Sequence, residues 1–368
     1  MATVALPIDG ASASRRLLRW LREGFFSTPT SALITLVIAY WLSGALPRMY
    51  AWLVTYSVLG PSTFAACVQS GGACWAFLYD KYRLILFGTY PYDDQWRAAL
   101  AVGLFVAAVV VTCIPALWSA RSVRRTLIFA WAIVFAAIVW LMWGGFAGLA
   151  RVEVRTWAGL PLTMMLAAVG VVVAFGLSIF LALGRQSDMP VIRWFSIAYI
   201  ELMRGVPLIS LLFMASVMFP LLVPPDVNVD KLLRAQIAFI MFFAAYMAEA
   251  IRGGLQAIPS GQYAAAEAIG LTYWQSRRRI ILPQALRLVI PSLVNIFIAA
   301  FKDTSLVIVI SMFDLLGTAN AAKADPKWWG IYIESYLFIA AIYLVFCAAM
   351  SRYSQYLEAR LGALRGHD

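Results

Sequence analysis

Lys302 and Asp303 interrupt an apolar run that extends from residue 288 to residue 313. An ionised side chain at the centre of a membrane helix costs about 2.5–3.5 kcal/mol on insertion scales, so such residues usually mark a function. Adjacent helical positions point about 100° apart, so the two charges need not pair with each other. Asp303, Thr304 and Ser305 also favour helix starts, where free N–H groups attract anions. These four residues are candidates for contact with the charged groups of a solute; the alternative is a structural pair bonded to neighbouring helices.

The sequence lacks the residues that most enzyme mechanisms require. The only histidine is His367, which removes zinc-hydrolase motifs and Ser–His or Cys–His catalysis. No lysine precedes Ser or Thr, so the sequence has no Walker A phosphate loop. The acidic residues in or near the apolar runs are Glu201, Glu249, Asp303 and Glu334, and they form no evident pair of the kind that an aspartyl enzyme needs. We therefore expect no catalytic residue, no metal site and no cofactor in this chain.

The composition is that of a membrane protein. Only 13% of the 368 residues are charged, against about 25% in soluble domains, and the mean hydropathy is +0.81. The net charge of +11 is typical of basic loops that face anionic lipid, and we expect no nucleic-acid partner. A spanning helix needs roughly 20 apolar residues. We predict an all-α, polytopic bundle of about eight transmembrane helices, the first of which could instead be two short ones, at residues 30–58, 98–118, 126–149, 160–184, 200–223, 235–251, 287–311 and 331–352.

Basic residues orient these helices. If both ends of the chain are cytoplasmic, the inside segments carry most of the 29 Lys and Arg residues, as the positive-inside rule requires. The arginine-rich start is not followed by a short cleavable signal, so we expect the first helix to remain. The predicted organisation is a cytoplasmic tail at 1–29, a three-helix extension at 30–150 with a long outer loop at 60–97, and a five-helix core at 151–360.

The four cysteines divide into two groups. Cys67 and Cys74 fall in the aromatic-rich outer loop, where a disulfide is compatible with an oxidising compartment, and the sequence leaves their redox state open. Cys113 and Cys347 lie in apolar runs and are expected to be packing residues.

Two similar short stretches, ELMRG and EAIRG, place an acid and a base three residues apart. Glu201 and Arg204 in the first, and Glu249 and Arg252 in the second, lie on one helix face and can pair. One interpretation is an ordinary ion pair at a helix end followed by a glycine terminator. The other is that these pairs hold the following cytoplasmic loop and its neighbouring helix in register.

The loop at 253–285 predicts two short helices joined by a glycine. Ser260 is a candidate N-cap, QYAAAEAI favours helix, and Gly270 can end it in the left-handed conformation. Thr272 and Gln275 then form a capping box for a second helix, and Pro283 can set a bend before the next span. The alanine-rich surface suits close docking of a partner, while an amphipathic loop on the lipid surface is the alternative.

This loop resembles the cytoplasmic loop of ABC importer permeases, which reads Glu-Ala-Ala, three residues, Gly, nine residues, Ile, one residue, Leu-Pro. Ala264 replaces the leading glutamate of that pattern, and Glu267 follows one turn later. The stretches YIELMRGVPLISLLF, AEAIRGGLQAIPSGQ, LPQALRLVIPSLVN and FKDTSLVIVI resemble the polar or general L-amino-acid uptake branch, in its long form with extra N-terminal helices. The resemblance covers about 160–355. The residues that match the loop pattern are Ala265, Ala266, Gly270, Ile280, Leu282 and Pro283.

The resemblance implies a bacterial inner-membrane permease that imports L-amino acids by alternating access. It implies a homologous or identical second permease, an ATPase dimer that holds ATP and Mg²⁺ and grips residues 262–283, and a periplasmic binding protein that delivers the amino acid. The segment 302–305 would border the translocation path. The alternative from another class is an ion-coupled secondary amino-acid transporter, in which Lys302, Asp303 or Glu334 would be an ion site.

Overall fold

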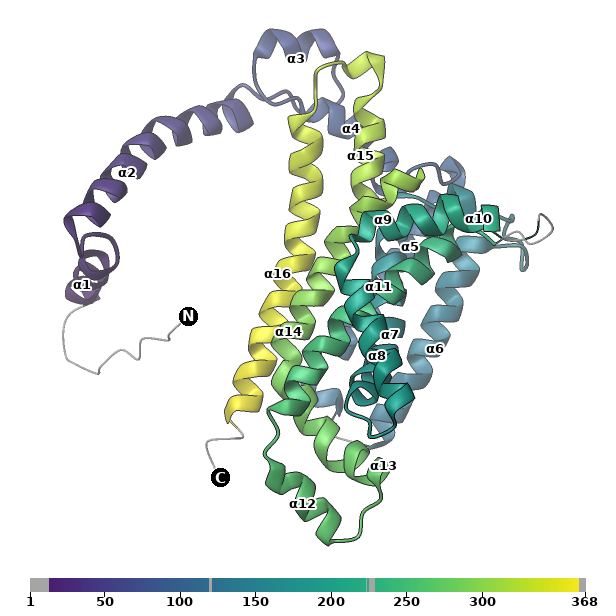
Figure 1. Cartoon of the computed structure of the whole chain (residues 1–368). Helices are drawn as coiled ribbons and strands as arrows, with labels where there is room; N and C mark the ends of the chain where they lie inside the picture. The colour runs from purple at the N-terminus through teal and green to yellow at the C-terminus, as the bar shows by residue number, and fades with distance from the viewer. Residues whose placement is uncertain (1–12, 119–120, 223, 225–228, 364–368) are drawn as a thin grey trace. The chain divides into compact units, whose positions relative to one another are not determined.

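The computed structural model describes residues 13–118, 121–222, 224 and 229–363, and the regular elements of this part of the chain are all helices (Figure 1). The first twelve residues of the predicted tail, and His367, lie outside the described residues. Within the described residues, seven helical segments are long and apolar enough to cross a membrane, or eight if one bent pair counts as a span. An all-helical membrane bundle of about eight spans is thereby confirmed. The seven segments are Pro29–Thr55, Tyr92–Thr112, Arg125–Trp143, Gly159–Arg185, Lys231–Gln256, Tyr273–Ile310 and Ile333–Arg360.

The prediction of one uninterrupted helix over 200–223 is wrong. The structure has α8 (Pro190–Gly205) and then α9 (Leu208–Phe213), η5 (Met214–Met218) and α10 (Phe219–Leu222), and the two parts are bent by 101°. Val206 between them has extended backbone, with φ −103° and ψ 132°. The cause is Pro207, since a proline disfavours helical geometry in the residue before it and supplies no N–H.

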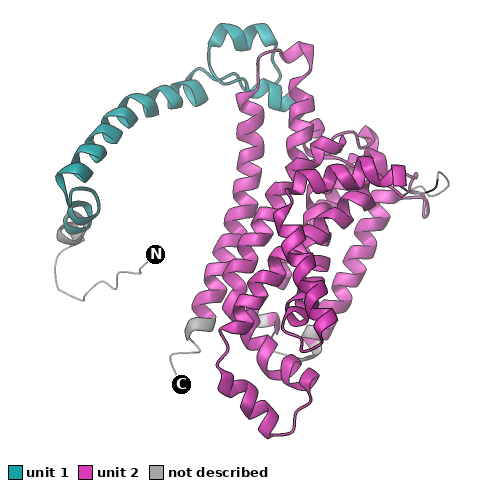
Figure 2. Cartoon of the chain, viewed as in Figure 1, with its two compact units in different colours: residues 1–79 teal, residues 80–368 magenta. Residues whose placement is uncertain are grey.

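Two compact units divide the chain after Tyr79 (Figure 2). The described part of the first unit contains α1 (Ala13–Phe25), α2 (Pro29–Tyr50) with its continuation η1 (Ala51–Thr55), and α3 (Phe64–Ser70). The run at 24–79 therefore holds one candidate span rather than two. A disulfide joins Cys67 in α3 to Cys74, with the Cα atoms 5.4 Å apart. The boundary at residue 150 between the predicted N-terminal extension and the five-helix core was drawn from sequence motifs, and it remains a prediction.

The second unit, from Asp80 onward, is built around three long helices. They are α7 (Gly159–Arg185), α11 (Lys231–Gln256) and α14 (Leu282–Asp303), and α7 and α11 form the most extensive helix pair in the described chain. Besides α8, α9, η5 and α10, its other elements are the end of α4 (Trp75–Phe87), η2 (Tyr92–Asp94), α5 (Gln95–Thr112), η3 (Pro115–Trp118), α6 (Arg121–Trp143), η4 (Val154–Thr156), α12 (Ser260–Ala268), α13 (Tyr273–Ser276), η6 (Arg277–Ile281), η7 (Thr304–Ile310), α15 (Leu315–Lys323), η8 (Pro326–Trp328) and α16 (Ile333–Ala363).

Small residues allow the core helices to approach closely. A Cβ on Gly254 of α11 would lie 2.7 Å from the carbonyl oxygen of Ala285 in α14, and a Cβ on Gly184 of α7 would lie 2.4 Å from the Ser196 hydroxyl of α8. Such contacts are typical of membrane bundles, because lipid offers helices no hydrophobic drive to associate and close packing must hold them together. These close backbone approaches lie near the ends of α7 and α11 that adjoin the loop following α11.

Candidate functional site

The loop after α11 folds into an elbow, which we define as residues 260–281. Helix α12 (Ser260–Ala268) ends where Gly270 adopts φ +73°. The Gly270 N–H donates to the Glu267 carbonyl at 2.9 Å, and the Leu271 N–H donates to the Ala266 carbonyl at 3.2 Å. This is a Schellman ending, which requires a residue that tolerates the left-handed conformation. The predicted stop at Gly270 is confirmed.

The second arm of the elbow begins at the predicted capping box. Thr272 accepts from the Gln275 N–H, and the Gln275 side chain accepts from the Thr272 N–H at 3.0 Å. The predicted N-cap at Ser260 is wrong, because Pro259 occupies that position and no side chain caps the helix. Pro283 lies in the first turn of α14, directly after the π-helix η6, and it does not interrupt the helical run Tyr273–Ile310.

The exposed surface of the elbow combines small side chains with large apolar ones. Ala264, Ala265 and Glu267 are exposed, while Ala266 packs inward. Beside the alanines stand two large hydrophobic side chains, Ile269 at 71% exposure and Trp274 at 62%. Exposed apolar groups of this size, next to small residues that let a partner approach, are typical of docking surfaces.

An arginine holds the two arms of the elbow together. The Arg277 guanidinium lies 4.6 Å from the centre of the Tyr263 ring and 4.9 Å from that of Tyr273, so it is stacked between the two arms. The Tyr263 hydroxyl donates to the Leu255 carbonyl near the end of α11 at 3.0 Å. Ile280 and Leu282 pack against the helix core. The angle of the elbow is therefore tied to α11 on one side and to α14 on the other.

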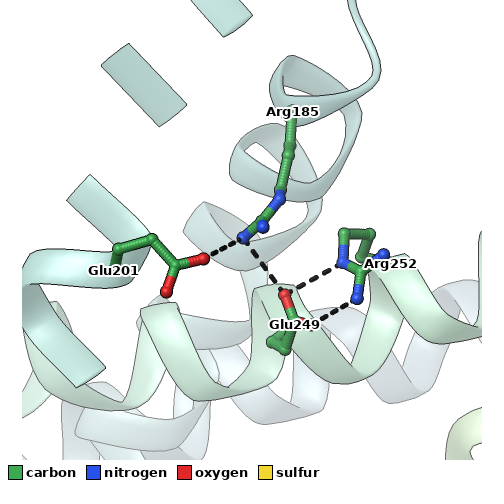
Figure 3. Close-up of polar contacts among 4 residues, drawn as sticks. All are labelled: Arg185, Glu201, Glu249 and Arg252. Atoms are coloured by element: carbon green, nitrogen blue, oxygen red, sulfur yellow. Dashed lines mark hydrogen bonds and ion pairs between the residues drawn. The ribbon is translucent and has the colours of Figure 1, made fainter. Parts of the chain in front are cut away.

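A four-residue ion network lies beside the elbow (Figure 3). Arg252 Nη2 lies 2.5 Å from Glu249 Oε1, and Arg252 Nε donates to Glu249 Oε2 at 3.0 Å. Arg185, the last residue of α7, places Nη1 2.9 Å from Glu201 Oε1 and 3.3 Å from Glu249 Oε2. The network thus joins α7, α8 and α11 at one end of the bundle.

One of the two predicted ion pairs is present and the other is not. Glu249 pairs with Arg252 as expected, but Glu201 pairs with Arg185 instead of Arg204. The Arg204 guanidinium stands 5.8 Å from the centre of the Tyr246 ring. Arg185 was missed because its partners are on other helices, although its place as the single charge ending an apolar run was a usable signal.

Lys302 and Asp303 lie at the opposite end of α14 from the elbow. Lys302 is exposed and Asp303 is half-buried, and no hydrogen bond or ion pair joins either side chain to another described residue. The expected helix start at these residues is wrong: α14 passes directly into the 3₁₀-helix η7, and Asp303 caps nothing. Neither side chain forms a structural bond within the described chain, and contact of these residues with a solute stays a prediction.

A buried carboxylate, which sequence reasoning missed, fixes the segment that follows. Asp314 caps α15 by accepting from the Gly317 N–H at 2.9 Å, and Oδ2 accepts from the hydroxyls of Tyr343 at 3.2 Å and Thr304 at 3.4 Å. Burial raises the pKa of the Asp314 carboxyl, and the amide and hydroxyl hydrogen bonds only partly offset this. Asp314 therefore connects the end of α14, with its free charges, to α15 and α16. The signal was a local one, an aspartate directly before an apolar helical stretch.

Comparison with known proteins gives concordant results. The family described as "Binding-protein-dependent transport system inner membrane component" matches residues 174–363. The "Inner membrane amino-acid ABC transporter permease protein YhdY" of Escherichia coli (strain K12) is 46% identical over 98% of this chain and 97% of that protein. The "Glutamate/glutamine/aspartate/asparagine transport system permease protein BztC" of Rhodobacter capsulatus is 36% identical over 94% of this chain and 93% of that protein.

One solved structure matches just over half of this chain. The "Crystal structure of an amino acid ABC transporter with histidines" has a chain that is 32% identical, covers 55% of this chain and 92% of its own length, and superposes with a TM-score of 0.49.

Proposed function

This chain belongs to the family of binding-protein-dependent transport system inner membrane components and is the permease of an amino-acid ABC importer, and we propose that residues 262–283 are the loop through which a separate ATPase drives it. The family membership decides against the ion-coupled alternative. As a permease, the chain carries no ATPase domain of its own, and ATP use belongs to the ABC system of which it is a part.

One observation carries the coupling proposal: a single helical run of 38 residues, Tyr273–Ile310, contains both the second arm of the elbow and Lys302. At about 1.5 Å per residue, positions 273 and 302 are separated by roughly 43 Å along the axis. A helix of this length transmits tilt from one end to the other. Movement imposed on the elbow would therefore displace the charged end of α14, which is what alternating access requires.

The ion network supports the same proposal on the neighbouring helices. Because α11 leads into α12 through only Ala257, Ile258 and Pro259, a pull on the elbow acts on α11 near Glu249. Arg185 joins Glu249 to α7 and, through Glu201, to α8. The network would thus make the three helices respond together, and exchange of its partners would distinguish the inward-open and outward-open states.

We propose that Lys302, Asp303, Thr304 and Ser305 border the path of the substrate. An L-amino acid carries an ammonium and a carboxylate, which suit the opposite charges of Asp303 and Lys302. Polar amino acids, such as those named for the Rhodobacter relative, are the proposed class. Arg185, Glu201, Glu249 and Arg252 are proposed to support the elbow and not to contact substrate.

The proposed assembly has two permeases, two ATPases and a periplasmic amino-acid-binding protein. An ATPase dimer offers two equivalent surfaces, and this chain has one elbow, so a second permease, identical or homologous, is required. ATP and Mg²⁺ would bind the ATPase. Both termini are proposed to be cytoplasmic. The Cys67–Cys74 disulfide supports this orientation, because it suits an outer loop in an oxidising periplasm.

The deciding experiment is purification of the native complex from membranes through a tag on this chain, with mass-spectrometric identification of every subunit. We expect an ATPase with a Walker A loop and a second permease. After reconstitution with the binding protein in liposomes, uptake of amino acid should require ATP inside and be unaffected when ion gradients are collapsed. Uptake that follows an ion gradient and ignores ATP would overturn the proposal.

A further inference from the structure

Helix α1 separates basic and apolar residues onto opposite sides. Its sequence, ASRRLLRWLREGF, has arginines at positions 15, 16, 19 and 22. With about 100° between successive residues, these positions share one side of a helix, and positions 17, 21 and 25 share the other. Trp20, Leu21 and Phe25 are 60%, 36% and 41% exposed. The apolar side of the described helix is therefore largely open.

The corner between α1 and α2 is held by hydrogen bonds. Only Phe26, Ser27 and Thr28 separate the two helices. The Thr35 hydroxyl of α2 donates to the Phe25 carbonyl at the end of α1, at 3.0 Å. Thr28 and Ser31 form a reciprocal capping box that starts α2, with Pro29 in its first turn. Figure 1 shows α1 turned aside at the end of α2 instead of extending it.

This corner keeps α1 close to the start of the first candidate span. Since α2 begins the first candidate span at Pro29, the short connection leaves α1 within a few residues of the lipid headgroups. A helix with a basic side and an apolar side that includes tryptophan and phenylalanine binds in the interfacial plane, and its arginines attract anionic headgroups. Helix α1 has both features, and its charge complements that of an anionic leaflet.

We propose that α1 lies in the plane of the cytoplasmic leaflet, with Leu21 and Phe25 in the acyl boundary and Arg19 and Arg22 on anionic phospholipid headgroups. The choice of the cytoplasmic leaflet rests on the orientation given under the proposed function. The attachment of α1 to anionic lipid does not depend on that orientation. Helix α1 would then be a lipid-dependent anchor for the first span.

The test measures the depth of single spin labels on the full chain. Cys113→Ser and Cys347→Ser leave the Cys67–Cys74 disulfide intact. A label is then placed at Leu21→Cys, on the apolar side, or at Glu23→Cys, on the polar side, as the matched control. The protein is reconstituted in vesicles of phosphatidylcholine with or without phosphatidylglycerol. Collision rates with oxygen and with a water-soluble nickel chelate report depth.

In phosphatidylglycerol vesicles we expect the oxygen-to-nickel ratio at position 21 to exceed that at position 23 severalfold. The ratio at position 21 should fall when phosphatidylglycerol is omitted and when four arginines are replaced together. Equal ratios at the two positions in phosphatidylglycerol would overturn the proposal. If the label at position 21 stays equally deep without phosphatidylglycerol and after the arginine replacements, the choice of anionic lipid would be overturned. The replacements are Arg15→Gln, Arg16→Gln, Arg19→Gln and Arg22→Gln.

A second arm separates this proposal from the orientation of the chain. An impermeant maleimide applied to intact cells should leave Glu23→Cys unmodified and modify it only after lysis. Modification in intact cells, together with a lipid-buried label at position 21, would contradict the proposed orientation of the permease while leaving the attachment to anionic lipid in place.

Discussion

Arg185 Nη1 lies 3.3 Å from Glu249 Oε2, a contact between the last residue of α7 and the second half of α11. Both side chains are about one-fifth exposed, so the pair is partly screened from water. Glu249 also holds Arg252, and Arg185 also holds Glu201. The contact therefore joins the two ion pairs into one series of alternating charges that links α7, α8 and α11 just before the elbow.

Replacing Arg185 should uncouple transport more than it destabilises the fold. Arg185→Gln leaves Glu201 and Glu249 without their shared cation, and for a partly exposed network the expected loss of stability is about 1 kcal/mol. We expect ATP-driven uptake to fall severalfold while the complex still hydrolyses ATP. The control is Arg204→Gln, whose side chain is in no ion pair among the described residues and which should retain uptake. Equal effects of the two substitutions would contradict the proposed coupling role.

A side chain at position 270 should disrupt the elbow. Left-handed backbone costs roughly 1–2 kcal/mol for a residue with a Cβ, and a β-branched residue suits it poorly. With φ at +73°, Gly270→Val should change the angle between α12 and α13 and reduce copurification of the ATPase. Gly261→Ala is the control, because nothing lies within 4 Å of its added Cβ and its φ is ordinary. Wild-type uptake and copurification in Gly270→Val would count against the elbow as the docking element.

Removing the charge at position 302 should affect substrate handling without affecting assembly. No described residue forms an ion pair with Lys302, so Lys302→Met breaks no structural bond. We expect normal yield and thermal stability, and a loss of uptake of at least about tenfold, corresponding to one charge-assisted contact of about 1.4 kcal/mol. ATPase activity stimulated by binding protein and amino acid is the second measurement. Normal uptake with an intact complex would remove the substrate role.

Arg97 should be required for the stability of the α5–α6 pair. Its fully buried side chain donates to the Leu141 carbonyl at 2.8 Å and to the Ala150 carbonyl at 3.0 Å, and so satisfies carbonyl groups at the end of α6 and beyond it. Arg97→Met would leave these groups without a charged donor, at about 1.5–3 kcal/mol per bond. We expect a clear fall in the thermal unfolding temperature in detergent. Arg155→Gln, at a side chain that is 80% exposed, should leave that temperature unchanged.

The ion pairs of Lys81 with Asp80 and Asp325 should lose their stabilising effect at alkaline pH. Burial acts to lower the pKa of Lys81, but hydrogen bonds to Asp325 at 2.6 Å and to Asp80 outweigh it and raise the pKa above 10.5. A base whose pKa is raised by folding stabilises the fold below its unfolded pKa, and that contribution disappears as pH rises through the folded value. The difference in unfolding temperature between wild type and Lys81→Met should be constant from neutral pH up to pH 10.5, where both carboxylates are ionised, and should shrink above it. A difference that persists unchanged above that pH would contradict the assigned ion pairs. Lys231→Met, at an exposed position, is the control.

The sequence by itself determined the features that depend on neighbouring residues. Uncharged length placed the candidate spans, because a helix must cross about 30 Å of hydrocarbon with its own residues. Gly270 and the Thr272–Gln275 box set the ends of two short helices through bonds spanning a few residues. The motif spacing around Ala265 and Pro283 indicated the family, which the comparisons confirm. Pro207 was a local signal too, but the uncharged run across it favoured a continuous helix that the structure does not have.

Only the tertiary structure decided which distant side chains meet. Arg185, Glu201 and Glu249 come from three helices, and their pairing depends on close approaches such as Gly184 against Ser196. Asp314 meets Thr304 and Tyr343 because α14, α15 and α16 converge there. The physical reason is range: helices and caps form from bonds between residues three or four apart, whereas an ion network forms where packing brings helices together, and no pattern in one helix encodes its partner's position.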